Sequence, residues 1–297
     1  MKDRIEYLTP DRMNSETPIW IDPVGGLGDI LMLSTAIKKA YDKYGKKFHM
    51  SRRSHYTQFF VGHLAIEEIG NPPEDADIVC NDYWSRPDFN NMNNKALNIV
   101  FKIFGVDDCD TDLLYLPNRD ADVATDLLIK NIPWGQKTVA ISFSSESPRK
   151  MMHPIKWHII VEKLLAQQCF VLQVGGYGDI PIRGAYSLLG VTTPLQICEV
   201  LKHVDLVITP DNFIMHAAKL VNKPAIALFG PTEPERYGYQ NHICLRAERS
   251  NCEFANECLG PHVSDNYATQ CPKNEGHCMN SFDENKIVDI AMSILTK

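Results

Sequence analysis

Apolar strand-like runs alternate with helical patterns along this chain, and the alternation starts twice. The first series opens with the run at residues 18–24 and the second with the run at 138–143. Strands that alternate with helices predict parallel sheets covered by helices on both faces. Two such series in 297 residues predict two α/β domains, 1–135 and 136–297, joined by a linker at 132–136.

Apolar residues at helical or strand spacing predict the individual elements. The first series indicates helices at 30–44, 55–68, 91–104 and 118–131, and further strands at 46–51 and 77–80. The second series indicates further strands at 170–174, 205–209 and 225–229, and helices at 156–167, 193–203, 213–221 and 283–295.

The formal net charge of −7 argues against nucleic acid as a partner. Seven basic residues nevertheless gather between Lys38 and Arg53, with one acidic residue among them. They are either a solvated helix face and loop or a local patch for an anionic acceptor or a membrane surface. The N-terminal segment has no apolar core of signal-peptide length, and no stretch reaches the roughly 18 apolar residues of a membrane span. We therefore expect a cytoplasmic protein, at the inner face of the membrane if it contacts one, with reduced cysteines.

The sequence Gly-Gly-Leu-Gly-Asp at residues 25–29 joins the first strand to the first helix. Glycines permit a tight turn, and the free N–H groups of a helix start attract anions. We therefore expect Gly25, Gly26 and Gly28 to form an anion-binding or acceptor-binding loop. Asp29 is either a cap for its helix or a general base at the carboxyl end of a strand, where open α/β sheets bind ligands.

A dinucleotide-binding interpretation of the same turn is disfavoured. With Gly26 and Gly28 as the first two glycines of the fingerprint, its third glycine position is occupied by Leu31. The acidic ribose ligand expected about 20 residues further on is absent, and basic residues stand at 49–53 instead.

The second predicted domain carries the most specific pattern, DLVITPDNFIMHAAKLVNKPAIALFGPTEPERYGY, at residues 205–239. It indicates a strand, a turn with Asp211 and Asn212, a helix with His216, another strand and a Gly-Pro-Thr turn. Such a turn places polar side chains and a helix start at the end of a buried strand, which suits an anionic ligand.

Together with GGLGDILMLSTAIKKAY at residues 25–41 and KWHIIVEKL at 156–164, this pattern closely resembles glycosyltransferase family 9. That family contains the ADP-heptose:lipopolysaccharide heptosyltransferases. The resemblance is strong over residues 138–240 and 20–45 and faint from about 50 to 135. It implies an α/β fold of the GT-B type, with two facing Rossmann-like domains and mostly parallel sheets. It also implies an inverting transfer from a nucleoside-diphosphate sugar.

The resemblance also assigns roles to residues of this chain. Asp29 matches the Gly-Asp of the family and would be the base that deprotonates the acceptor hydroxyl, on the acceptor side of the protein. The donor would be bound by the second domain, through these residues: Ser144, Ser145, Lys156, Asp179, Asp211, Asn212, His216, Gly230 and Thr232.

Two departures from the family pattern concern the donor site. Where the family often has Asp-Thr-Gly, this chain has Asp-Asn-Phe at residues 211–213. The phosphate-binding lysine of the heptosyltransferase I type stands two residues before the tryptophan, whereas Lys156 directly precedes Trp157. Arg149 and Lys150 are alternatives for that role. The departures leave the reaction class in place and do not specify heptose as the sugar.

A lysine, hydroxyl groups and a helix N-terminus stabilise a leaving diphosphate without a metal. We therefore expect no cofactor to be required for catalysis. The alternative is the metal-binding Asp-x-Asp of the other large glycosyltransferase fold. Residues 108–112 match it formally, but a short pattern inside an acidic run is more typical of a solvated loop.

Cysteines at positions 252, 258, 271 and 278 have the spacing C-x5-C-x12-C-x6-C in an otherwise polar loop. Cys252, Cys258, Cys271 and Cys278 supply four soft ligands, which suit one structural zinc or iron. The alternative is a set of free or partly paired thiols. Some family members have cysteines here, and some related heptosyltransferases hold iron with four cysteines.

The leading hypothesis is an inverting glycosyltransferase that acts on a saccharide or glycolipid in cell-surface polysaccharide synthesis, such as lipopolysaccharide. The contrasting hypothesis is a non-catalytic subunit that binds a nucleotide sugar within a larger assembly. A sugar-nucleotide epimerase of the same two-domain fold is a third. Product formed from the donor alone would indicate the epimerase, and donor binding without turnover would indicate the binder.

Overall fold

The computed structural model describes residues 4–52, 56–106, 114–117, 123–133, 135–255, 258, 269–273 and 277–296. It divides into two compact units, Met1–Arg119 and Asp120–Lys297. The division falls before the predicted linker at 132–136, because Leu128, Ile129 and Ile132 pack into the core of the second unit.

The first unit holds a four-stranded sheet whose paired strands are all parallel, in the order β3-β2-β1-β4. Its strands are β1 (Ile19–Ile21), β2 (Phe48–Ser51), β3 (Ile66–Gly70) and β4 (Asp77–Val79). Its helices are α1 (Pro10–Asn14), α2 (Leu27–Tyr44) and α3 (Ala96–Ile103), with shorter 3-10 turns at Thr57–Phe60, Tyr83–Ser85 and Pro87–Asn90.

The second unit holds a six-stranded parallel sheet in the order β10-β9-β8-β5-β6-β7. Its strands are β5 (Thr138–Ile141), β6 (Phe170–Gln173), β7 (Tyr186–Ser187), β8 (Leu206–Pro210), β9 (Ala225–Phe229) and β10 (His242–Arg246). Its helices are α4 (Val123–Ile129), α5 (Pro154–Ala166), α6 (Pro194–Leu201), α7 (Phe213–Leu220), α8 (Pro234–Tyr237) and α10 (Glu284–Leu295).

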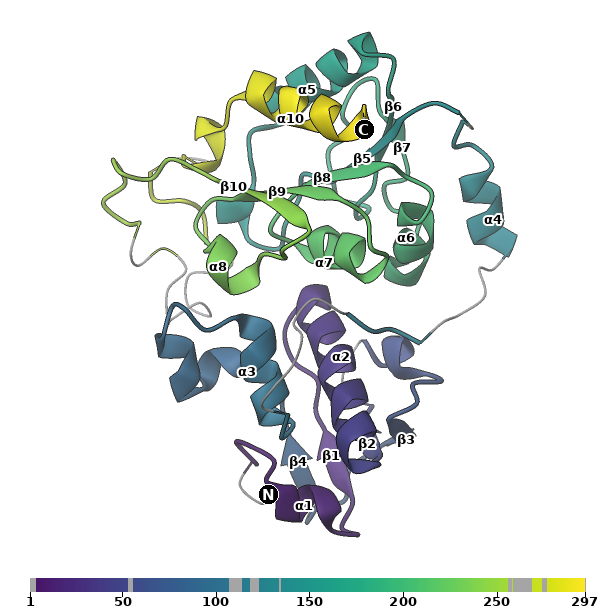
Figure 1. Ribbon diagram of the computed structural model, residues 1–297, viewed down its shortest axis with the longest axis vertical. Coiled ribbons are helices and arrows are strands. Elements are labelled where there is room, and N and C mark those ends of the chain that lie inside the picture. Colours follow the sequence, from purple (N-terminus) through teal and green to yellow (C-terminus); the bar gives the residue numbers. More distant parts are fainter. Residues whose placement is uncertain are drawn as a thin grey trace. The chain divides into compact units, whose positions relative to one another are not determined.

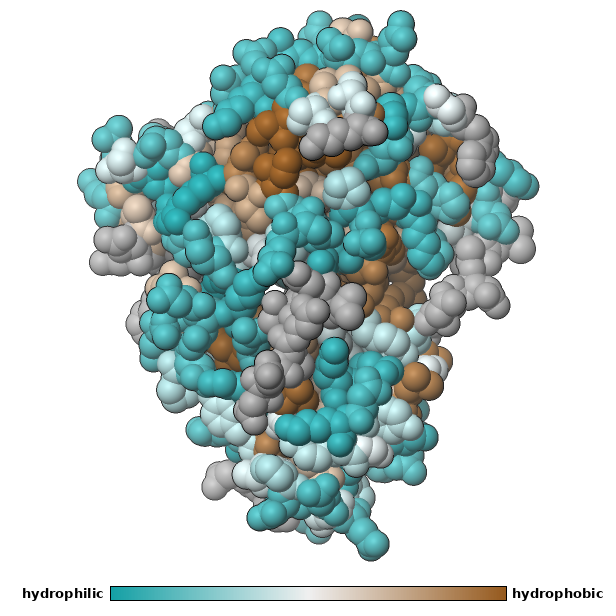
Figure 2. Space-filling model, in the orientation of Figure 1, coloured by the Kyte–Doolittle hydropathy of each residue, from teal (hydrophilic) through white to brown (hydrophobic). Residues whose placement is uncertain are grey.

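Helices cover both faces of the second sheet, as its fully buried strands β5, β8 and β9 require. Figure 1 shows α5 and α10 on one side of the sheet and α6 and α7 on the other. Trp157 of α5 and Val288 of α10 belong to one apolar core, and Ile197 of α6 and Ala217 of α7 to the other. On the face that Figure 2 shows, hydrophilic residues cover most of the surface of both units. The predicted α/β class with mostly parallel sheets is confirmed.

Each sheet has one point at which the strand order changes direction. In the second unit the chain leaves β5 toward β6 and β7, then returns to β8 on the other side of β5. In the first unit it leaves β1 toward β2 and β3, then returns to β4 on the other side of β1. The loops that follow the two neighbouring strands diverge there, and open α/β sheets bind ligands in that crevice.

The helix predicted at residues 55–68 is wrong in part. A 3-10 turn spans Thr57–Phe60, and the strand β3 begins at Ile66. Gly62 between them has a φ of +79°, a left-handed conformation that ends the turn and that glycine adopts without strain. The strands β7 and β10 were not predicted, and α3 begins at Ala96 rather than at residue 91.

Among the residues that the structure describes, no helix is both long enough and apolar enough to cross a bilayer.

Two neighbouring leucines on α5 test which face of this helix packs into the core that contains Trp157 and Val288. Leu164 is fully buried, whereas Leu165 is 40% exposed. We expect Leu164→Ala to lower the free energy of unfolding by about 2–5 kcal/mol, because it removes buried methyl groups and leaves a cavity. Chemical denaturation of both variants provides the measurement, with Leu165→Ala as the control that loses much less. Equal losses would contradict the assigned buried face of α5.

Candidate functional site

The glycine turn of the first unit leads from β1 to Asp29. Gly25 has a φ of +90°, and a Cβ at this position would collide with the Asp29 carboxylate. Oδ2 of Asp29 accepts a hydrogen bond from the Gly26 N–H at 2.8 Å, which closes the first turn of α2. Asp29 therefore caps its own helix, as the first of its two interpretations predicts, and the turn has no room for a larger residue at Gly25.

The loop after β4 supplies a second partner for the same carboxylate. The Tyr83 hydroxyl donates to Oδ1 of Asp29 at 2.9 Å. The Asn81 side chain holds the two loops together, since it accepts from the Val24 N–H and donates to the Val24 carbonyl, both at 2.9 Å. Sequence reasoning did not find Asn81 or Tyr83. The signal was the sequence Asn-Asp-Tyr-Trp directly after a short strand, once that strand is known to lie beside β1.

In the second unit, the loops after β5, β6 and β8 share one hydrogen-bond network. The Ser144 hydroxyl donates to Oδ2 of Asp179 at 2.6 Å, and that oxygen also accepts from the Gly176 N–H at 2.8 Å. The Asn212 amide donates to the Ser144 carbonyl at 2.8 Å. Ser145 stands beside this network, and its hydroxyl accepts from the Ser147 N–H at 3.3 Å. The structure thus brings together predicted residues from three separate segments.

Asn212 also caps α7. Its Oδ1 accepts from the N–H groups of Ile214 at 2.9 Å and Met215 at 3.4 Å, and from the Thr209 hydroxyl at 2.8 Å. Asn212 is therefore the N-terminal cap of α7. This side chain satisfies two N–H groups of the helix start, so fewer N–H groups of α7 are left for an anion.

Lys150, one of the two alternatives to Lys156, lies beside Asp211. Both Lys150 and Asp211 are buried, and the Lys150 amine donates to the Asp211 carbonyl at 3.0 Å and to its Oδ2 at 3.2 Å. The Lys156 amine instead pairs with Glu284 at 2.6 Å and donates to the Phe282 carbonyl at 2.7 Å. Lys156 therefore fastens α5 to the start of α10, and the structure does not bring it into contact with Asp211.

His216 lies on α7, one turn after the cap. Its Nδ1 is 2.6 Å from the Tyr239 hydroxyl. Burial lowers the pKa of His216 to about 4, and the nearby Asp211 opposes this only in part. The ring is therefore neutral at pH 7, so it offers a hydrogen bond rather than a positive charge.

The turn after β9 contains Gly230 and Thr232. A Cβ at Gly230 would collide with the Met279 side chain and stand 3.2 Å from Sγ of Cys278, so this turn packs closely against the segment of Cys278 and Met279. Thr232 is 6% exposed, and its hydroxyl has no hydrogen-bond partner among the residues that the structure describes. This buried hydroxyl is a candidate for a contact with a ligand.

The four clustered cysteines line a single cavity with Arg149 and Arg249, and none of them is in a disulfide. Arg149 donates to Sγ of Cys258 at 3.2 Å and to its carbonyl at 3.1 Å. Burial, then the neighbouring thiols of Cys258 and Cys271, raises the pKa of Cys278 to about 11. The donor set suits a soft metal. Within the described part of the chain, however, no three His, Cys, Asp or Glu residues are placed as a metal-binding group.

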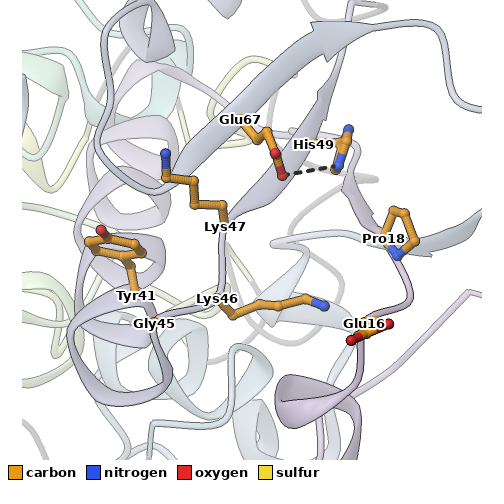
Figure 3. A pocket seen from close by; sticks show the side chains of 8 residues that line it. All are labelled: Glu16, Pro18, Tyr41, Gly45, Lys46, Lys47, His49 and Glu67. Carbon is orange, nitrogen blue, oxygen red and sulfur yellow. Dashed lines mark ion pairs between the residues drawn. The ribbon is translucent and has the colours of Figure 1, made fainter.

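A separate hollow of about 330 Å³ lies in the first unit and is shown in Figure 3. Pro18 and Lys47, which precede β1 and β2, line it, together with Glu16 and with His49, which is 3.7 Å from Glu67. In a parallel sheet all amino ends lie at one edge, so this hollow is at the edge opposite Asp29. It mixes both signs of charge, and nothing in it selects a ligand.

The basic stretch between Lys38 and Arg53 is partly neutralised. Lys38 pairs with Asp42 at 2.6 Å, and the Lys46 amine donates to the carbonyls of Ser15 and Thr17. Arg53 lies outside the described residues, as does the Asp-x-Asp pattern at 108–112.

The family model of glycosyltransferase family 9 (heptosyltransferase) matches residues 124–263. A family 9 glycosyltransferase of Veillonella parvula has a similar structure, with a TM-score of 0.69 at 13% identity over 96% of this chain and 98% of that one. The iron-containing dodecameric glycosyltransferase TibC of enterotoxigenic Escherichia coli gives a TM-score of 0.70 at 15% identity over 96% of this chain and 79% of TibC. The E. coli ADP-heptose lipopolysaccharide heptosyltransferase II gives 0.66 at 11% identity over 94% and 99%.

No curated protein is similar enough in sequence to match this chain. At such low identities the solved structures show the fold alone, and they confirm the GT-B type of α/β fold. The family match over residues 124–263 adds the chemistry. The chain is a nucleotide-sugar-dependent glycosyltransferase of the GT-B fold, and its residues 124–263 match the model of glycosyltransferase family 9.

Proposed function

We propose that this sugar-transferring enzyme moves a sugar, with heptose as the first candidate, from a nucleoside-diphosphate sugar to a saccharide or glycolipid acceptor, with inversion. The product would belong to a cell-surface polysaccharide such as lipopolysaccharide. One observation carries the proposal: in both units, predicted residues stand at the point where the strand order changes direction. Asp29 follows β1 in the first unit, and Asp211 and Asn212 follow β8 in the second.

The reaction follows from these groups. Asp29 takes the proton of the acceptor hydroxyl, and the acceptor oxygen attacks the anomeric carbon. The bond between that carbon and the diphosphate oxygen breaks, and the nucleoside diphosphate leaves with the electron pair. Attack from the face opposite the leaving group inverts the configuration. TibC, which has a similar fold, is described in a complex with ADP-D-β-D-heptose, and this supports ADP-heptose as the first donor to test.

We assign the donor to the second unit, without a requirement for a divalent cation. Lys150 carries the positive charge, and Ser144, Ser145 and Thr232 supply hydroxyl groups. We assign the contact with the donor sugar to Asp211, and the neutral His216 lies one turn further along α7. Positioned cationic and hydroxyl groups stabilise the charge that develops on the leaving diphosphate.

For the acceptor we propose a glycolipid at the cytoplasmic face of a membrane. The basic stretch that begins at Lys38 supports this, because anionic headgroups attract clustered lysine and arginine side chains. The competing proposal is a non-catalytic binder, which would bind the donor and turn over no acceptor.

The first test concerns Asp29. Asparagine keeps an oxygen that accepts from the Gly26 N–H, so the helix cap survives, but the amide cannot take a proton at neutral pH. We expect Asp29→Asn to lower kcat roughly 10²–10⁴-fold, with donor affinity unchanged. Nucleoside diphosphate released from ADP-heptose or UDP-glucose, in the presence of a panel of saccharide and glycolipid acceptors, gives the rate.

Asp42→Asn is the matched control, since it changes a carboxylate of the same helix that pairs with Lys38. Its turnover should stay normal. Normal turnover by Asp29→Asn would refute the base assignment, and donor binding by the wild-type chain with no turnover on any acceptor would favour the non-catalytic binder.

The second test separates Lys150 from Lys156. Lys150 forms a buried ion pair with Asp211. Neutralising one of these two residues alone would leave the other as an uncompensated buried charge, so both are neutralised together. We expect Lys150→Met with Asp211→Asn to weaken binding of ADP or UDP by roughly 10- to 150-fold, since a hydrogen bond to a charged group contributes about 1.5–3 kcal/mol. Isothermal titration calorimetry in EDTA measures the affinity.

Lys156→Met with Glu284→Gln is the control, because it neutralises the other ion pair of the same unit and should bind within about twofold of wild type. A larger loss of ADP or UDP affinity in the Lys156 double variant than in the Lys150 double variant would indicate that Lys156 binds the phosphates. Wild-type binding that vanishes in EDTA and returns with magnesium would contradict the metal-free donor site.

We further propose that Cys252, Cys258, Cys271 and Cys278 together hold one structural zinc or iron. Four thiols around one cavity and the iron-containing description of TibC support this. The metal would cross-link a polar loop and take no part in the transfer. Elemental analysis of protein purified without a metal-affinity tag should find about one metal per chain, with the thiols protected from alkylation. Removal of the metal should lower the unfolding temperature, because metal binding contributes to folding free energy. Metal-free protein with four freely alkylated thiols would leave only free cysteines.

A further inference from the structure

Two hydrogen bonds of different origin reach the Asp29 carboxylate. The bond from the Gly26 N–H to Oδ2 comes from the neighbouring turn and is the usual cap of a helix start. The bond from the Tyr83 hydroxyl to Oδ1 comes from 54 residues away and joins the loop after β4 to the loop after β1. A helix cap needs only the first bond, so the second requires another explanation.

Tyr83 itself is rigidly placed. The residue is 6% exposed, and its ring packs against Phe89 and edge-on against Trp84, with centroids 5.7 and 5.0 Å away. Its N–H donates to the Asn81 carbonyl at 2.8 Å, while the Asn81 side chain is bonded twice to Val24. The loop directly before the helix of Asp29 is therefore hydrogen-bonded to the loop that carries the Tyr83 hydroxyl.

Packing alone does not require a tyrosine here, because phenylalanine would fill the same apolar surroundings. A tyrosine hydroxyl in a buried position needs a hydrogen-bond partner, and this one has the carboxylate that we assign as the base. Donors to both oxygens restrict rotation of the carboxylate about the bond between Cβ and Cγ. A base is effective only when the reacting atoms are held at hydrogen-bond distance and aligned.

We propose that Tyr83 is a positioning residue for Asp29, whose hydroxyl orients the carboxylate toward the acceptor hydroxyl. The inference rests on the proposed role of Asp29 as the base. In the transfer the proton passes from the acceptor oxygen to the Asp29 carboxylate, and the new bond forms between that oxygen and the anomeric carbon. Tyr83 keeps its own proton throughout and donates a hydrogen bond before and after the step.

A double-mutant cycle on kcat tests the inference. We expect Tyr83→Phe to lower kcat about tenfold or more in the wild-type chain, with the KM of the donor unchanged. In the Asp29→Asn background the same substitution should cause no further loss, because Tyr83 acts through the carboxylate that is already removed. Release of nucleoside diphosphate, with the donor and acceptor that the wild-type chain uses, gives the rates.

Tyr7→Phe is the matched control. Its hydroxyl donates to Oδ2 of Asp88 at 3.2 Å, so it removes the same kind of bond in the same unit and should leave kcat unchanged. An equal loss on Tyr83→Phe in both backgrounds, which misfolding would also produce, overturns the positioning role. So does full activity of Tyr83→Phe. Normal turnover by Asp29→Asn is a different result, because it overturns the base assignment itself.

Discussion

The parallel direction of the strands is the constraint on which the rest of this structure depends. In each unit it places the carboxyl ends of all strands at one edge of the sheet. The loops that leave this edge carry Asp29 and Tyr83 in the first unit, and Ser144 and Asn212 in the second. Polar groups far apart in sequence meet there without a long connection, because the strand order opens a space at one point of each sheet.

The sequence was sufficient for features that depend on local patterns. Alternating strands and helices predicted both parallel sheets, and the Gly-Asp turn and the Asp-Asn turn were found at the ends of β1 and β8. It was insufficient where the feature depends on strand order. Tyr83 reaches Asp29 only because β4 pairs with β1, and a single sequence does not show that pairing. The edge strand β3 was missed because its five residues alternate poorly between buried and exposed.

The choice between lysines shows the same limit. Lys156 was selected from its place next to Trp157, yet its amine pairs with Glu284, more than a hundred residues away. Lys150 lies in a short 3-10 turn, Pro148–Lys150, where helical periodicity gives no guide to direction. Its burial beside Asp211 depends on tertiary packing, which a local sequence pattern does not show. The departure from the family pattern at residues 212–213 also has a structural counterpart, since the side chain of Asn212 caps α7.

Arg149 and Lys150 are consecutive residues, and their buried side chains are anchored to different parts of the second unit. Arg149 donates hydrogen bonds to Sγ of Cys258 and to the Thr269 carbonyl, whereas Lys150 donates to the Asp211 carboxylate. A peptide bond neither stretches nor twists freely, so the position of the Lys150 amine depends on the segment that Arg149 contacts. Misplacement by about 1 Å is enough to cost a factor of about 100 in rate at a reacting centre. In the proposed transfer, the order around Cys258 and Thr269 would therefore affect how accurately Lys150 meets the leaving diphosphate.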